Sequence, residues 1–120
     1  MTIGQPGTER PSRGEVWTID FDPVIGHEQG GRRPGLIVSS DLLHVIPSQL
    51  VYVVPITTRD RGIESHVPIV PPVGGLRRPS FAMTEQLRAV SKQRLQRRLG
   101  VVSPEILAQT MARVRLFLDL

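Results

Sequence analysis

The sequence predicts a mainly β protein of the α+β class, a small antiparallel β-barrel followed by a C-terminal α-helix. Short runs of β-branched and aromatic residues alternate with glycine and proline clusters, which is typical of antiparallel strands joined by turns. The runs are not separated by the long helices that parallel strands need as connections. Only the last part of the chain repeats its apolar residues at helical spacing.

Strands are expected at residues 15–21, 35–39, 50–56, 65–70, 80–84 and 87–90. In the first of these, Trp17, Ile19 and Phe21 fall on one side, at the two-residue period of a half-buried strand. The third is apolar on both faces, so it should lie in the centre of the sheet. Its Pro55 cannot donate a hydrogen bond to a neighbouring strand, so the pairing should loosen there.

The C-terminal helix should begin after Ser103. A serine cap, a proline at the first helical position and an acidic residue in the first turn follow one another in Ser103, Pro104 and Glu105. An apolar stripe should hold this helix against the barrel, and it consists of Leu107, Met111, Val114 and Leu118, widened by Ile106 and Phe117. A shorter helical turn is expected at 91–95.

Length and composition limit the class of protein. The chain has 120 residues, enough for one domain, which we expect to span residues 13–120 after a flexible extension at residues 1–12. No apolar run reaches the roughly 18 residues of a membrane span, and the polar start lacks the pattern of a secretory signal. We therefore expect a cytoplasmic protein. The absence of cysteine excludes disulfides, thiolate metal sites and cysteine nucleophiles.

The charge balance favours a nucleic-acid partner. The net charge is +4, and all of the 15 basic residues except Lys92 are arginine. The planar guanidinium group of arginine binds phosphate through two hydrogen bonds at once. A base-composition bias of the source genome would explain the same excess of arginine over lysine, and that alternative stays open.

The segment at residues 27–34 concentrates polar groups between two apolar strands. Two adjacent glycines allow a sharp bend and a close approach to a ligand. Pro34 holds the preceding Arg33 in an extended conformation at the start of the next strand, where its guanidinium could clamp a phosphate. The alternative is an exposed loop with solvated arginines, one of them paired with Glu28.

Two further segments carry groups suited to binding or catalysis. Thr57 and Thr58 end the central strand, where their hydroxyls can donate to a phosphate oxygen or simply finish the strand. In the segment at residues 84–88, alternation would put Glu85 on one face of a strand and Gln86 on the other. Glu85 is a candidate general base, and an exposed ion pair with Arg88 or another arginine is the alternative.

These segments, in this order, resemble the MazF/PemK family, the toxin components of bacterial type II toxin–antitoxin pairs. The resemblance covers nearly everything after the first dozen residues, and it rests on residues 13–17, His27-Glu28-Gln29, Arg33-Pro34, Pro55-Ile56-Thr57-Thr58, Glu85-Gln86-Leu87-Arg88 and the terminal helix. One motif would be weak evidence, whereas several in order with compatible gaps are strong.

The resemblance implies an SH3-like barrel, a homodimer inhibited by a cognate antitoxin, and a sequence-selective endoribonuclease that cleaves single-stranded RNA, whether mRNA, rRNA or tRNA. The catalytic arginine and threonine of the family correspond to Arg33 and Thr57. Its RNA-contacting positions correspond to His27, Glu28, Gln29, Thr58, Glu85 and Gln86. One position departs from PemK-type members, which have an arginine where this chain has Met83. We therefore favour the MazF-type arrangement.

No cofactor or metal is expected for this chemistry, because RNA carries its own nucleophile, the 2′-hydroxyl. The sequence has neither a His-x-x-x-His spacing nor clustered carboxylates suited to divalent ions. The proton acceptor stays open among Glu85, Glu28 and His27. The alternative function is a non-enzymatic toxin of the same fold that poisons DNA gyrase, as CcdB toxins do, and a plain RNA-binding barrel comes third.

Overall fold

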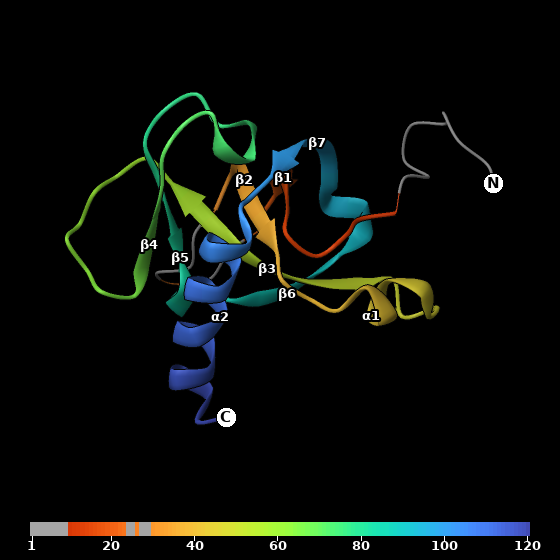
Figure 1. Ribbon diagram of the computed structural model, residues 1–120. Coiled ribbons are helices and arrows are strands. Elements are labelled where there is room, and N and C mark those ends of the chain that lie inside the picture. The colour runs from red at the N-terminus through yellow and green to blue at the C-terminus, as the bar shows by residue number, and fades with distance from the viewer. Residues whose placement is uncertain (1–9, 24–25, 27–29) are drawn as a thin grey trace.

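The computed structural model describes residues 10–23, 26 and 30–120. The strands are β1 (Glu15–Asp20), β2 (Arg32–Ile37), β3 (Leu50–Thr57), β4 (His66–Ile69), β5 (Ser80–Met83), β6 (Arg88–Ser91) and β7 (Leu95–Val101). The helices are α1 (Asp41–Val45) and α2 (Pro104–Leu118), with 3₁₀ turns η1 (Val73–Gly75), η2 (Thr84–Gln86) and η3 (Lys92–Arg94). Figure 1 shows α2 lying across the sheet, with its C-terminal end projecting beyond it.

The strands form one antiparallel sheet in the order β4-β5-β3-β2-β1-β7, and β6 pairs with β3. The predicted antiparallel sheet with a C-terminal helix is confirmed. The word barrel is loose, because the sheet curls without closing: among the described residues no ladder joins β6 to β7, and η3 connects them instead.

The predicted central strand is β3, which has partners on both sides. Its N-terminal half pairs with β6 as far as Val53, and its C-terminal end pairs with β5 from Ile56 onward. The change of partner falls at Pro55, which lacks the N–H group that a continuous ladder would need. The loosened pairing predicted at this proline is therefore confirmed, and it lets one strand belong to both halves of the curled sheet.

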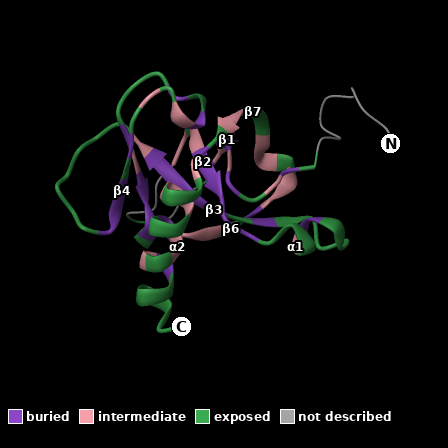
Figure 2. Cartoon of the chain, in the orientation of Figure 1, coloured by how far each residue is buried: buried purple, intermediate pink, exposed green. Residues whose placement is uncertain are grey.

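Two hydrophobic clusters lie on opposite faces of the sheet, and Figure 2 shows buried residues concentrated in the strands. The larger cluster lies between the sheet and α2 and includes Val16, Leu36, Ile56 and Val114. The smaller one holds the predicted trio of Trp17, Ile19 and Phe21 together with Ile37, Val51, Val53 and Val90. Because strand residues alternate between faces, membership of a cluster tells which face each strand residue presents.

Helix α2 begins as predicted. The Ser103 hydroxyl accepts a hydrogen bond from the backbone N–H of Ile106 at 3.2 Å, and Pro104 follows the cap. Four of the six predicted stripe residues meet the larger cluster: Val114 belongs to it, and Ile106, Leu107 and Met111 pack against it. The last turn lies outside it, where Phe117 and Leu118 are more than half exposed. None of the helices in the described ranges is long and apolar enough to cross a membrane.

Strand β7 and helix α1 were not predicted, and neither were the turns η1 and η2. Strand β7 has polar residues at its centre, which hide the alternation that marks a strand. Helix α1 has only five residues and is capped by Ser40, whose hydroxyl accepts from the N–H of Leu42. Strand β2 also begins three residues earlier than predicted, which places Arg33 inside the strand and its ladder with β1.

Candidate active site

Arg33 and Thr57 lie on the same face of the sheet. Arg33 is paired with Ile19 of β1, a member of the smaller cluster. Thr57 has the same parity along β3 as Val53, which also belongs to that cluster. Residues directly opposite in an antiparallel pair share a face, so both side chains are on the side of the smaller cluster, which we call the Arg33 face.

The two residues lie at the adjoining ends of neighbouring strands. The last pair in the ladder between β2 and β3 joins Gly35 to Pro55, and Arg33 and Thr57 each lie two residues beyond it. The same register, extended past the end of this ladder, would put Arg33 opposite Thr57. Side chains directly opposite each other in an antiparallel pair have Cβ atoms about 5 Å apart. In that register a guanidinium and a hydroxyl would reach one phosphate group at once.

The backbone around Arg33 holds its side chain in place. Its Nε donates to the carbonyl oxygen of Gly30 at 2.7 Å, and the guanidinium is thereby fixed over the glycine hinge. Two residues along the strand, a Cβ atom at Gly35 would lie 2.5 Å from Cδ1 of Ile19 and 3.2 Å from Cζ of Phe21. Glycine is needed there because the side chains of β1 occupy the space beside the strand.

The loop between β1 and β2 is tied at its base. The Asp22 carboxylate accepts a hydrogen bond from the N–H of Gly31 at 2.9 Å, and Arg94 donates to the carbonyl oxygens of Asp20 and Asp22. Arg88 lies over the ring of Phe21, with its guanidinium carbon 5.7 Å from the ring centre. The predicted contact residues His27, Glu28 and Gln29 lie outside the described residues.

Glu85 is held by partners that the sequence did not indicate. Its two carboxylate oxygens each accept a hydrogen bond at 2.9 Å, one from the Ser65 hydroxyl and one from Nε2 of His66. The predicted alternative, an ion pair with Arg88, is wrong, because Arg88 lies instead against Phe21. The expected strand alternation is wrong here too, since residues 84–86 form a 3₁₀ turn.

The surroundings of Glu85 make it a weaker base. Burial raises the pKa of this carboxyl, but the hydrogen bonds from His66, its own backbone and Ser65 outweigh burial, so the net shift is downward. A carboxylate with a lowered pKa takes a proton less readily. Glu85 therefore suits binding and orientation better than proton abstraction.

The remaining predicted residues flank the same end of the sheet. Thr58 is exposed directly after β3. Gln86 ends η2, and Arg88, two residues later, pairs with Val53 of β3. Sequence reasoning missed Phe81, which pairs with Thr57 and therefore shares the Arg33 face. It also missed His66. Neither residue has a local pattern around it, and only the strand register brings each one to the site.

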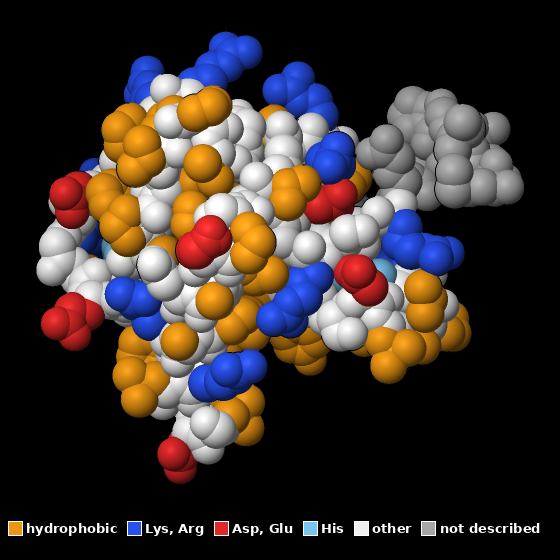
Figure 3. All heavy atoms as spheres, in the orientation of Figure 1, with side chains coloured by type: hydrophobic (Ala, Val, Ile, Leu, Met, Phe, Trp, Pro, Cys, Tyr) orange, Lys and Arg blue, Asp and Glu red, His pale blue; other side chains and the backbone are white. Residues whose placement is uncertain are grey.

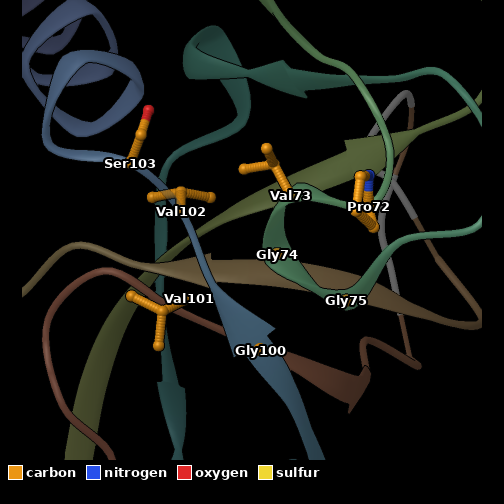
Figure 4. A pocket seen from close by; sticks show the side chains of 8 residues that line it. All are labelled: Pro72, Val73, Gly74, Gly75, Gly100, Val101, Val102 and Ser103. Carbon is orange, nitrogen blue, oxygen red and sulfur yellow. The ribbon is translucent and has the colours of Figure 1, made fainter.

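A hollow of about 570 Å³ lies elsewhere, between η1 and β7 (Figure 4). Apolar and glycine residues line most of it: Pro72, Val73, Gly74, Gly75, Gly100, Val101, Val102 and Ser103. None of them carries a charge, and the Ser103 hydroxyl already caps α2. In the described part of the chain, no group of three or more His, Asp or Glu side chains is arranged to hold a metal ion.

The fold and the site define a small antiparallel β protein with a C-terminal helix and a cationic group held at the edge of a glycine-rich loop. Residues 12–118 match the family described as PemK-like, MazF-like toxin of type II toxin–antitoxin system. The chain belongs to this family.

Named relatives and solved structures agree with this assignment. The chain is 34% identical over 113 residues to endoribonuclease MazF9 of Mycobacterium tuberculosis, covering 90% of this chain and 96% of that protein. It is 32% identical over 96 residues to endoribonuclease EndoA of Bacillus subtilis, covering 79% of this chain and 83% of that protein. The crystal structure of MazF from Deinococcus radiodurans superposes with a TM-score of 0.84 at 25% identity, covering 93% of this chain and 99% of that one.

Proposed function

We propose that this chain is a sequence-selective endoribonuclease toxin that cleaves single-stranded RNA without a metal ion and is inhibited by a cognate antitoxin. The family and the two relatives named endoribonucleases support this activity. The observation that carries the proposal is that Arg33 and Thr57 share one face at the adjoining ends of the neighbouring strands β2 and β3. These comparisons do not favour the alternative of a CcdB-like gyrase poison.

The reaction is an internal displacement at phosphorus. The 2′-oxygen of the ribose attacks the adjacent phosphorus, and the bond from phosphorus to the 5′-oxygen breaks. The 2′-hydroxyl gives its proton to a base, and the departing 5′-oxygen takes up a proton. The products are a 2′,3′-cyclic phosphate, which water can open to a 3′-phosphate, and a 5′-hydroxyl. No oxidant, reductant or further reactant is needed.

In this reaction Arg33 binds the scissile phosphate, where negative charge grows as phosphorus becomes five-coordinate. Thr57 donates a hydrogen bond that fixes the phosphate or the 2′-hydroxyl. Thr58, Glu85 and Gln86 contact the RNA around them. His27 and Glu28 stay the candidates for the proton acceptor, because the lowered pKa of Glu85 makes that residue a poor one.

The proposed partners follow from the same function. Single-stranded RNA, mRNA above all, is the substrate, and an antitoxin segment with acidic residues would compete with RNA for the arginine-bearing face.

We also propose that the chain acts in the cytoplasm as a homodimer. Exposed apolar side chains at the end of α2 support the dimer, since Leu116 and Phe117 are 75% and 54% exposed. Figure 3 shows hydrophobic side chains interspersed with charged ones in the lower part of the molecule, where α2 ends. Sedimentation of the purified chain measures its mass in solution and tests the dimer.

Cleavage of a long single-stranded RNA by the purified chain in EDTA tests the activity. We expect cuts at specific sites, and we expect Arg33→Ala to lower the rate by about 10²- to 10³-fold, as the loss of one preorganised donor does elsewhere. Arg32→Ala is the matched control, because Arg32 is exposed and pairs with Asp20 on the other face of the sheet.

The rival functions give different results. Intact RNA together with inhibited DNA gyrase would support the CcdB-like alternative. RNA that is bound but not cut would support a plain RNA-binding protein. Full activity in Arg33→Ala would remove the proposed role of that guanidinium even if the chain cleaves RNA.

A further inference from the structure

Phe81 is an aromatic side chain beside Thr57 that the described hydrophobic core does not use. It is directly opposite Thr57 in the ladder between β3 and β5, so the two side chains lie on the Arg33 face. Its exposure is intermediate, and it is not among the partly buried residues that pack against either cluster of the described chain. On its other side it faces Pro68 of β4, which is exposed.

The Glu85 carboxylate lies on the same side of the sheet. His66, which donates to it, pairs with Met83, and Met83 has the same parity along β5 as Phe81. Strands lie about 4.8 Å apart, so β4 is about 10 Å from β3 and from Thr57. A strand of RNA held by its phosphate at Arg33 and Thr57 can therefore reach both Phe81 and Glu85.

The carboxylate is fixed in direction yet still able to accept hydrogen bonds. Each oxygen accepts one bond, from Ser65 or from His66, and a carboxylate oxygen has a second lone pair. The Glu85 side chain is 37% exposed, whereas that of His66 is 3% exposed, so only the carboxylate faces a ligand. The turn itself is pinned to the start of β4, because the hydroxyl and the N–H of Thr84 both donate to the carbonyl oxygen of Ser65.

The chemistry of these two groups selects one part of RNA. An aromatic ring binds any base by stacking, and single-stranded RNA leaves its bases free to stack. A carboxylate accepts hydrogen bonds from the amino group of a base, as it does from N4 of cytosine. Uracil has no amino group, and its one N–H is flanked by carbonyl oxygens that a carboxylate repels.

We propose that Phe81 and Glu85 form a base-binding subsite beside the cleavage site, in which one base stacks on the Phe81 ring and donates an amino group to Glu85. The subsite takes cytosine, adenine or guanine and rejects uracil. Ser65 and His66 act as positioning residues that orient the carboxylate. This inference rests on the proposed RNA-cleaving function.

The test uses the full chain and an oligonucleotide that contains the cleavage motif, first found by sequencing the 5′ ends of RNA cut by the wild-type protein. Phe81→Leu keeps an apolar side chain but removes the ring, and Phe81→Tyr keeps the ring as the matched control. We expect Phe81→Leu to raise KM about 5- to 150-fold, the range that stacking of one base covers, with little change in kcat. Phe81→Tyr should stay within about twofold of the wild type.

Substrates with uracil at one position at a time locate the amino contact. The wild type should reject uracil at one position next to the cut, and Glu85→Gln should lose that discrimination. His66→Leu should lose it in part, and His66→Gln should restore it, because the glutamine amide can still donate to the carboxylate. Unchanged base preference in Glu85→Gln, or equal KM values in Phe81→Leu and wild type, would overturn the subsite.

Binding of an oligonucleotide with 2′-deoxyribose at the cut separates this inference from the proposed function. If the wild type cuts RNA and Phe81→Leu binds this oligonucleotide equally well, the subsite is wrong and the cleavage proposal stands. If the wild type binds RNA without cutting it and Phe81→Leu weakens the binding, the subsite stands and the cleavage proposal fails. Thermal unfolding of each variant shows whether the fold is intact.

Discussion

Replacing Gly35 by alanine should disturb the packing that holds Arg33. An added Cβ would lie 2.5 Å from Cδ1 of Ile19, a contact too short to persist, and 3.2 Å from Cζ of Phe21. Both neighbours are fully buried, so neither can swing into solvent. Overpacking of this kind costs about 1–3 kcal/mol. Alanine recovers about 0.5–1 kcal/mol of backbone entropy relative to glycine.

The net expectation for Gly35→Ala is a loss of up to about 2.5 kcal/mol in the free energy of unfolding, or up to about 10 °C in Tm. The partner variant is Ile19→Val, which removes the clashing Cδ1 atom and alone costs about 0.5–1.5 kcal/mol. The double variant should be more stable than the sum of the two single losses predicts, by at least about 0.5 kcal/mol.

Urea unfolding followed by circular dichroism supplies the free energies of the wild type, both single variants and the double variant. Cleavage rates of the same four proteins report on Arg33, which is two residues from the substitution. The rate should fall in Gly35→Ala and recover in the double variant. Losses that add to within about 0.3 kcal/mol would refute the reasoning, because independent sites behave in that way.

Two further changes test the Glu85 pairing and the helix cap. The pKa of Glu85 is lowered in the folded protein, so the unfolded chain binds its proton more readily, and the pairing stabilises the fold above the ordinary glutamate pKa. That contribution should disappear as the pH falls through the lowered pKa. In this pH range Glu85→Gln should flatten the curve of unfolding free energy against pH. An unchanged slope in the variant would argue against the pairing. Ser103→Ala should lose about 1 kcal/mol of stability, measured by urea unfolding, because it removes the hydrogen bond from the N–H of Ile106. Ser103→Asp should keep the wild-type stability, because a carboxylate can accept the same hydrogen bond. Equal stabilities of the wild type and both variants would contradict the cap.

Most of the architecture could be predicted because it follows from local patterns. The alternation of Trp17, Ile19 and Phe21, the doubly apolar run of β3 and the cap of α2 each require only neighbouring residues. Strand β7 could not be predicted, because it shows no such local pattern. It lies at the edge of the sheet, where exposed polar residues are tolerated and no alternation has to be kept.

The candidate site could be predicted only in part. Arg33 and Thr57 were found through a family resemblance, and the strand register then shows how they come to share a face. The alternative for Glu85 was an ion pair with Arg88, three residues away, or with another arginine, and the structure gives it His66 of β4 instead. Spacing along the chain favours near neighbours, whereas the fold brings η2 against the start of β4, which is separated from it along the chain by η1 and β5.

By itself the sequence determined six of the seven strands to within a few residues, where the last helix starts and which family the motifs resemble, because periodicity and caps act over a few residues. Only the tertiary structure decided that Phe81 stands beside Thr57 and that His66 and Ser65 hold Glu85. These neighbours depend on the register between strands, which is set when both faces of the sheet bury their apolar side chains at once. That condition involves the whole chain, so the register cannot be predicted from any single segment.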